Sequence, residues 1–71
     1  MFAVSLRQSE HTREYSIASL GRLGWEVRVE EDRQPTRVAR YSDWHRVERA
    51  LARFRREVSD LTAHGWQQIP S

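Results

Sequence analysis

The stretch SDWHRVERALARFRREVSDLTAHGW, residues 42–66, decides the fold of this chain. Its larger apolar residues recur at alternating intervals of three and four, which is the spacing of one face of an α-helix. The stripe consists of Trp44, Val47, Leu51, Phe54, Val58 and Leu61. This spacing predicts one long amphipathic helix, whose apolar stripe must be covered by another part of the chain.

Both ends of the helix carry recognisable signals. Ser42 or Asp43 can accept a hydrogen bond from a free N–H group of the first turn. Gly65 stands where a left-handed residue commonly ends a helix, and Leu61 and Trp66 then occupy the two positions that meet in a Schellman motif. We therefore expect the helix to stop at Gly65 and Trp66 to fold back onto the core.

Short segments with alternating apolar residues precede the helix. Strands are predicted at residues 2–6, 15–17, 25–29 and 37–41. Loops or turns are predicted at residues 8–12, 21–24 and 31–35, and residues 67–71 are expected to form a short frayed tail.

This order of elements predicts an α+β domain. The short connections favour an antiparallel sheet of three to four strands, with the long C-terminal helix packed on one face. Trp25, Val27 and Val29 should be buried against that helix. We expect residues 1–71 to form a single small domain with an ordered core at about residues 13–66.

The composition narrows the function classes. The chain has 71 residues, a net charge of +2 and no cysteine, which excludes disulfides and thiolate metal sites. No apolar run is long enough to span a membrane, and the N-terminus does not resemble a signal peptide. We expect a cytoplasmic protein of bacterial type without a membrane partner. So small a core also favours dimerisation as a source of extra burial.

The sequence offers no metal site, no cofactor site and no catalytic residues. His11, His45 and His64 are far apart and form no known metal-binding spacing. The acidic run at residues 30–32 falls in a predicted turn, where carboxylates are solvated and keep ordinary acidity. We therefore do not expect an enzyme.

The basic residues suggest a nucleic-acid or anion contact. All twelve are arginine, which either reflects recognition of phosphate or carboxylate groups or follows from the codon usage of a GC-rich genome. The candidate contact residues are Arg40, Arg46, Arg49, Arg53 and Arg56. Glu57 and Asp60 are expected to pair with Arg53 and Arg56 and so to reduce the charge of this row.

The aromatic and N-terminal apolar residues suggest a second kind of surface. Trp25, Trp44 and Trp66 take inward positions and are expected in the core, whereas Phe2 and Tyr41 are the better candidates for an exposed contact. The N-terminal strand is too apolar for a free tail, so it must pack on its own core or on a partner. The candidate residues for self-association are Phe2, Val4 and Leu6.

Three stretches resemble a family of short bacterial proteins of unknown function. They are GWEVR at residues 24–28, YSDWHRVERA at residues 41–50, and Gly65-Trp66. The resemblance covers most of residues 13–66. It implies a small cytoplasmic domain without known activity, and it brings no catalytic residues to this chain.

The order of elements is also similar to that of Trp-Gly-Arg (WGR) domains, which bind DNA in some repair proteins. Those domains place a sheet before a helix that ends in Gly-aromatic, as Gly65-Trp66 does here. The naming motif is absent, because Leu20 precedes Gly21-Arg22. Single-stranded nucleic-acid binders with four strands and a helix offer a comparable analogy. Both similarities are at the level of topology.

Two hypotheses remain. The first is a non-enzymatic binding or interaction domain that associates with itself, as a homodimer, or with another protein. The second is a nucleic-acid-binding module that uses the arginine row on the exposed face of the helix.

Overall fold

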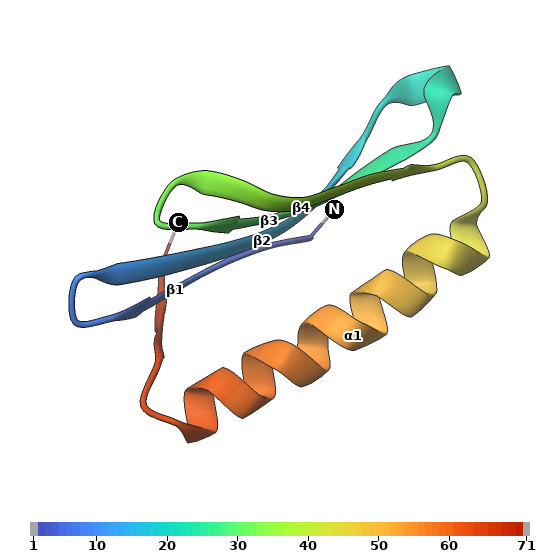
Figure 1. Cartoon of the computed structure of the whole chain (residues 1–71). Helices are drawn as coiled ribbons and strands as arrows, with labels where there is room; N and C mark the ends of the chain where they lie inside the picture. Colours follow the sequence, from blue (N-terminus) through green and yellow to red (C-terminus); the bar gives the residue numbers. More distant parts are fainter. Residues whose placement is uncertain (1, 71) are drawn as a thin grey trace.

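Five strands and one long helix make up the structure, a computed structural model that describes residues 2–70 (Figure 1). The elements are β1 (Phe2–Gln8), β2 (His11–Ser19), β3 (Trp25–Glu31), β4 (Gln34–Tyr41), α1 (Trp44–Ala63) and β5 (Gln67–Ile69). A short 3-10 helix, η1 (Gly21–Leu23), joins β2 to β3. Met1 and Ser71, the two ends of the expected domain, lie outside the described residues.

The strands form one antiparallel sheet in the order β4-β3-β2-β1-β5. The predicted α+β class with a helix on one face is confirmed, but the sheet has five strands rather than three to four. The fifth strand comes from the tail after the helix, where Gln67–Ile69 pairs with Ser5, Leu6 and Arg7 of β1. A strand of three residues is too short to show the alternating pattern from which the longer strands were predicted.

The hairpins are tighter than the sequence predicts. Residues 8–12 were expected to form a loop, but β1 runs to Gln8 and β2 begins at His11. Polar side chains do not prevent ladder hydrogen bonds, so the strands extend beyond their apolar residues. The β3–β4 hairpin turns at Asp32 and Arg33, both of which have positive φ, as a primed turn requires.

The helix α1 covers one face of the sheet, as Figure 1 shows, and the core lies between them. The buried residues are Leu6, Tyr15, Ile17, Val27 and Val29 from the sheet, and Val47, Ala50 and Phe54 from the helix. Within this core the ring of Tyr15 meets the ring of Phe54 edge to face, with 4.9 Å between their centres. The expected burial of the sheet against the stripe is therefore confirmed.

Two of the three tryptophans pack against the core as predicted, and one does not. Trp25 and Trp66 are partly buried against the core, as expected. Trp44 is 47% exposed, so its assignment to the core was wrong. It is the first residue of α1, and its ring lies beside that of Trp25 with 5.2 Å between their centres.

The predicted helix ends are confirmed. The backbone N–H of His45 donates to the side chain of Asp43, at 3.0 Å, so Asp43 is the N-cap. At the other end, the N–H of Trp66 donates to the carbonyl of Leu61 at 3.0 Å, and Gly65 has a φ of 95°. These are the bonds and the left-handed residue of a Schellman motif, which turns the chain toward β5.

A second glycine fixes where α1 begins. Gly24, just before β3, has φ 101° and ψ −130°, a backbone conformation that residues with a Cβ atom do not tolerate. A Cβ atom at this position would collide with the backbone carbonyl of Tyr41. Because Tyr41 ends β4 and leads directly into α1, this close approach ties the start of the helix to the sheet.

Gly24→Ala is therefore expected to destabilise the fold more than Gly21→Ala. Gly21 also has positive φ but faces open space, so alanine there should cost only about 1–2 kcal/mol of unfolding free energy. Alanine at position 24 adds the collision with Tyr41 and should cost clearly more. Urea unfolding followed by tryptophan fluorescence measures both variants, and equal losses would contradict the described contact.

Candidate nucleic-acid interface

The arginine row lies along the flank of α1 that faces β4. Arg46, Arg49, Arg53 and Arg56 are exposed, and together with Tyr41 and Ala52 they line a shallow hollow of about 520 Å³. At 1.5 Å of rise per residue, the row is about 15 Å long. The structure therefore brings four of the five predicted contact residues together on one surface.

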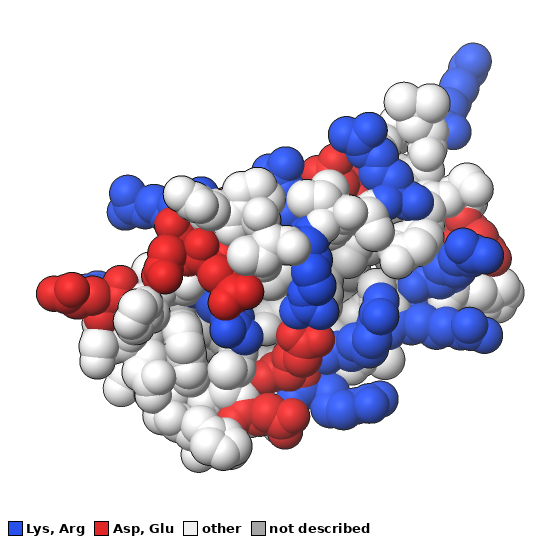
Figure 2. All heavy atoms as spheres, viewed as in Figure 1, with Lys and Arg blue, Asp and Glu red and all other residues white. Residues whose placement is uncertain are grey.

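This surface is visible in the charge distribution. In Figure 2 the blue side chains at the lower right lie over the N-terminal half of α1, while the C-terminal end of the helix is largely white. A second hollow of about 410 Å³ adjoins the first between β4 and α1, and the two share Tyr41 and Arg53. Basic groups thus border a continuous depression beside the open edge of β4.

Glu57, which was expected to pair with an arginine of the row, binds other residues. Glu57 accepts two hydrogen bonds from the guanidinium of Arg37 on β4, at 2.6 and 3.2 Å, and a third from the hydroxyl of Tyr15 at 3.0 Å. The predicted pairing of Glu57 with Arg53 is therefore wrong. Glu57 adjoins the apolar stripe, so its side chain turns toward the sheet rather than along the helix surface.

The predicted pairing of Arg56 with Asp60 is not found either. Within residues 2–70, none of the four row arginines takes part in an ion pair. Asp60 follows the row at its C-terminal end, where its backbone carbonyl contacts the ring of His64. The row therefore keeps four exposed positive charges over most of its length.

The environment of Glu57 keeps it ionised. Its pKa is lowered, chiefly by the hydrogen bonds from Arg37 and then by the bond from Tyr15, against an opposing effect of burial. The pKa of Tyr15 is raised, mainly because its buried hydroxyl is shielded from water. Near neutral pH the phenol is thus a proton donor and the carboxylate an acceptor, which ties α1 to both β2 and β4.

Arg40 lies apart from the row. Successive side chains of a strand point to opposite faces, so Arg40 lies on the outer face of the sheet while Tyr41 faces the helix. The guanidinium of Arg40 pairs with Glu26 at 3.2 Å, and Arg28 lies 3.7 Å from the same carboxylate group. The structure therefore places Arg40 in a mixed-charge network and does not bring it to the row.

The candidate residues for self-association lie on the helix-facing side of β1. Leu6 is fully buried, and Phe2 and Val4 are partly buried against the core. The ring centre of Phe2 is 6.1 Å from that of Phe54. Since β1 lies between β2 and β5, these apolar side chains find cover within their own chain, with Phe2 and Val4 only partly enclosed.

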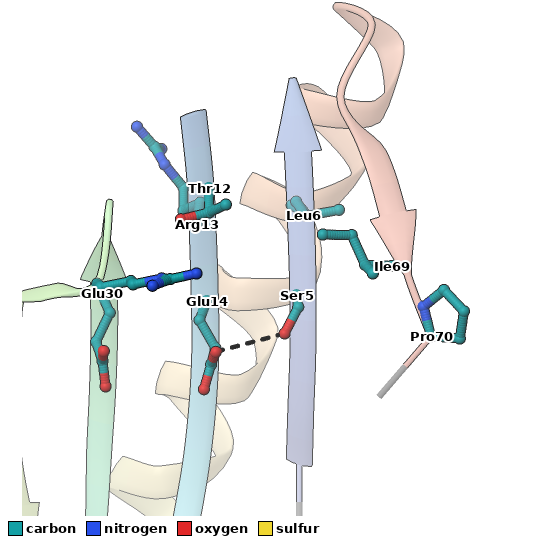
Figure 3. A pocket seen from close by; sticks show the side chains of 9 residues that line it. Ser5, Leu6, Thr12, Arg13, Glu14, Glu30, Ile69 and Pro70 are labelled. Atoms are coloured by element: carbon teal, nitrogen blue, oxygen red, sulfur yellow. Dashed lines mark hydrogen bonds between the residues drawn. The ribbon is translucent and has the colours of Figure 1, made fainter. Parts of the chain in front are cut away.

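A further hollow, of about 230 Å³, lies at the end of the sheet near β5 (Figure 3). Glu14 and Glu30 are directly opposite each other on β2 and β3, and the hydroxyl of Ser5 is turned toward Glu14 at 3.5 Å. Arg28 is 3.5 Å from Glu30 and compensates its charge. This face therefore has no single-sign surface comparable with the arginine row.

The histidines occupy separate places. His11 contacts Asp32 at 3.3 Å, His45 lies 3.8 Å from Glu48, and His64 follows the end of α1. Across residues 2–70 no three His, Cys, Asp or Glu side chains are grouped so as to hold a metal ion. In the same described part of the chain, no helix combines the length and apolar character that crossing a membrane needs.

Comparisons with protein-family models, with curated proteins and with solved structures give no match for this chain. The resemblances expected from the sequence, to a family of short bacterial proteins and to Trp-Gly-Arg domains, therefore stay predictions. The candidate interface is supported by its geometry and its charge.

The sequence did not predict that Glu57 binds Arg37 and Tyr15 instead of Arg53 of the row. Arg37, Tyr15 and Glu57 lie on three different elements, and their meeting depends on the register of β4 and on the rotation of the helix. One signal was present: Glu57 falls between Phe54 and Val58 at the border of the apolar stripe. An acid at that position can reach a basic group on the sheet as easily as one on the helix.

Glu57→Gln should make the free energy of unfolding less dependent on pH. Because the pKa of Glu57 is lower in the folded than in the unfolded state, its stabilising effect is present above the unfolded value of about 4.3 and is lost as the pH falls through the folded value. The variant should lose about 1 kcal/mol of unfolding free energy at pH 7, a modest figure because the pair is partly exposed. At about pH 2.5, below the unfolded value, the gap to the wild type should be smaller than at pH 7.

Urea unfolding at both pH values measures this gap. Glu10→Gln, in the exposed turn between β1 and β2, is the matched control and should show no gap at either pH. A gap of the same size at both pH values would show that the ionised carboxylate of Glu57 is not the stabilising species.

Proposed function

We propose that this chain is a small binding domain rather than an enzyme, and that it binds the phosphate backbone of nucleic acid through the arginine row. The observation that carries the proposal is the row itself, four exposed arginines without carboxylate partners on one flank of α1. Glu57, which lies four residues after Arg53 and next to Arg56 in the chain, is bound to Arg37 instead.

The chemistry of the row fits phosphodiesters. The guanidinium group is planar, keeps its charge at all physiological pH values and can donate two hydrogen bonds to one phosphate. The arginines are three or four residues apart, so successive groups follow each other at about 4.5–6 Å along the helix. A line of such groups can contact a few consecutive phosphates without reading the bases.

The arginines of the row lie on one flank of α1, and this placement supports nucleic-acid binding more strongly than the high arginine content alone. Codon usage explains why arginine replaces lysine, but it does not explain why Glu48 and Glu57, two of the three acids of α1, lie away from this flank. Asp43 caps the helix, Glu57 turns to the sheet, and Glu48 is near His45. Asp60 alone extends the row, so the expected contact lies toward the N-terminal half of the helix.

Tyr41 gives the surface a component without charge. It is partly buried and lines both hollows beside β4. A phenol at the rim of a basic surface can donate a hydrogen bond to a phosphate oxygen or pack against a sugar or base. The sequence likewise makes Tyr41 a candidate for an exposed contact.

Replacement of one row arginine should weaken binding and its dependence on salt. Arg53→Gln removes one phosphate contact, so affinity for an oligonucleotide should fall several-fold at about 50 mM salt, and the slope of log K against log salt should become shallower by about 0.7–0.9. Fluorescence anisotropy with labelled single- and double-stranded oligonucleotides measures both quantities.

Arg40→Gln is the matched control, because it removes the same charge from the opposite face of the sheet. It should change affinity and slope much less than Arg53→Gln. If the two variants weaken binding equally, net charge rather than the row determines it. Absence of binding by the wild type at about 50 mM salt would overturn the proposed function.

A further inference from the structure

The flank of α1 on the side away from the arginine row carries a second stripe. Its residues follow each other at intervals of four and three, so they lie in one line along the helix. They are Trp44, Glu48, Leu51, Arg55 and Val58. Glu48 and Arg55 are exposed, Leu51 and Val58 are partly buried, and Trp44 is 47% exposed. The stripe is about 21 Å long.

The N-terminal half of this stripe borders an apolar hollow. Trp44, Leu51 and Arg55 line it from the helix, and Phe2 and Trp25 line it from the sheet. Its volume is about 200 Å³. Exposed apolar surface of this kind, with a charged group at its rim, is typical of a place where another molecule packs.

The neighbouring part of β1 also has an open edge. β5 pairs with Ser5, Leu6 and Arg7 but does not reach the beginning of the strand. Phe2, which lines the hollow, and Val4 on the same strand are both only partly buried. Open backbone groups and incompletely covered apolar side chains thus occur together on this flank of the helix.

The charges of the stripe identify the occupant. Glu48 and Arg55 carry opposite signs and are placed almost symmetrically on the two sides of Leu51. If a second, antiparallel copy of the helix lies across the stripe with a twofold axis near Leu51, each Glu48 meets Arg55 of the other copy. Leu51 then meets its own counterpart, and Trp44 meets Val58.

We propose that this stripe is the contact between two copies of the chain. A surface that is its own complement under a twofold rotation is the requirement of a symmetric dimer. The arginine row fails that requirement, because two such rows would repel each other. The dimer would leave both rows on outward flanks, so the proposal neither needs nor contradicts nucleic-acid binding.

Neither charged residue has a strong competing partner in its own chain. The carboxylate of Glu48 lies 3.8 Å from the ring of His45, and both side chains are exposed. Within residues 2–70 Arg55 forms no ion pair. Because one helix stripe and a small hollow are less than a standard interface, we expect a weak dimer that forms with rising concentration.

Charge reversal tests the proposal. Glu48→Arg places two arginines opposite each other at both ends of the contact, and Arg55→Glu places two glutamates there. Each variant alone should therefore remain monomeric at concentrations where the wild type dimerises. A mixture of the two variants should form a heterodimer, because every 48–55 contact then joins opposite charges, and the double variant should dimerise like the wild type.

Sedimentation velocity over a concentration series measures each sample, with circular dichroism to verify folding. Glu10→Arg, which changes net charge as Glu48→Arg does but lies in the β1–β2 turn, is the control and should dimerise normally. Three results would each overturn the proposal: a wild type that stays monomeric at its highest attainable concentration, single variants that dimerise unchanged, or a mixture that stays monomeric.

Discussion

The rotation of α1 about its own axis is the constraint on which the rest of this structure depends. One helix must cover one face of the sheet, and burial of Val47, Ala50 and Phe54 determines roughly which side of the helix turns inward. The bonds of Glu57 to Arg37 and to the buried hydroxyl of Tyr15 set the rotation more finely. Directional polar contacts of this kind select one arrangement among several that bury similar apolar area.

That rotation gives the two flanks of the helix different characters. On the side of β4 it presents the arginine row beside Tyr41 and the open sheet edge. On the side of β1 it presents Trp44 and Leu51 next to an apolar hollow. Under the two proposals, this small domain with a single covered sheet face carries two separate contact surfaces, one for a polyanion and one for a second copy.

The sequence predicted what depends on local periodicity and capping. Short-range patterns predicted the helix, a cap at Ser42 or Asp43, the stop at Gly65 and the strands with clear alternation. The structure shows that Asp43 is the cap. It did not predict β5, whose pairing depends on where the chain emerges after the helix. The grouping of four arginines was predictable from their spacing. The position of Arg40 on the outer sheet face depends on the register of β4, and the pairing of Glu57 with Arg37 depends on a contact between distant elements.

An NMR titration of the labelled chain with an oligonucleotide tests directly whether the β4 flank of α1 is the polyanion-binding surface. We expect the side-chain Nε–Hε signals of Arg46, Arg49, Arg53 and Arg56 to shift together with the backbone signals around them. Signals of Arg28 and Arg40 on the outer sheet face should stay in place. Shifts centred on that outer face, or spread evenly over all arginines, would contradict this assignment of the surface.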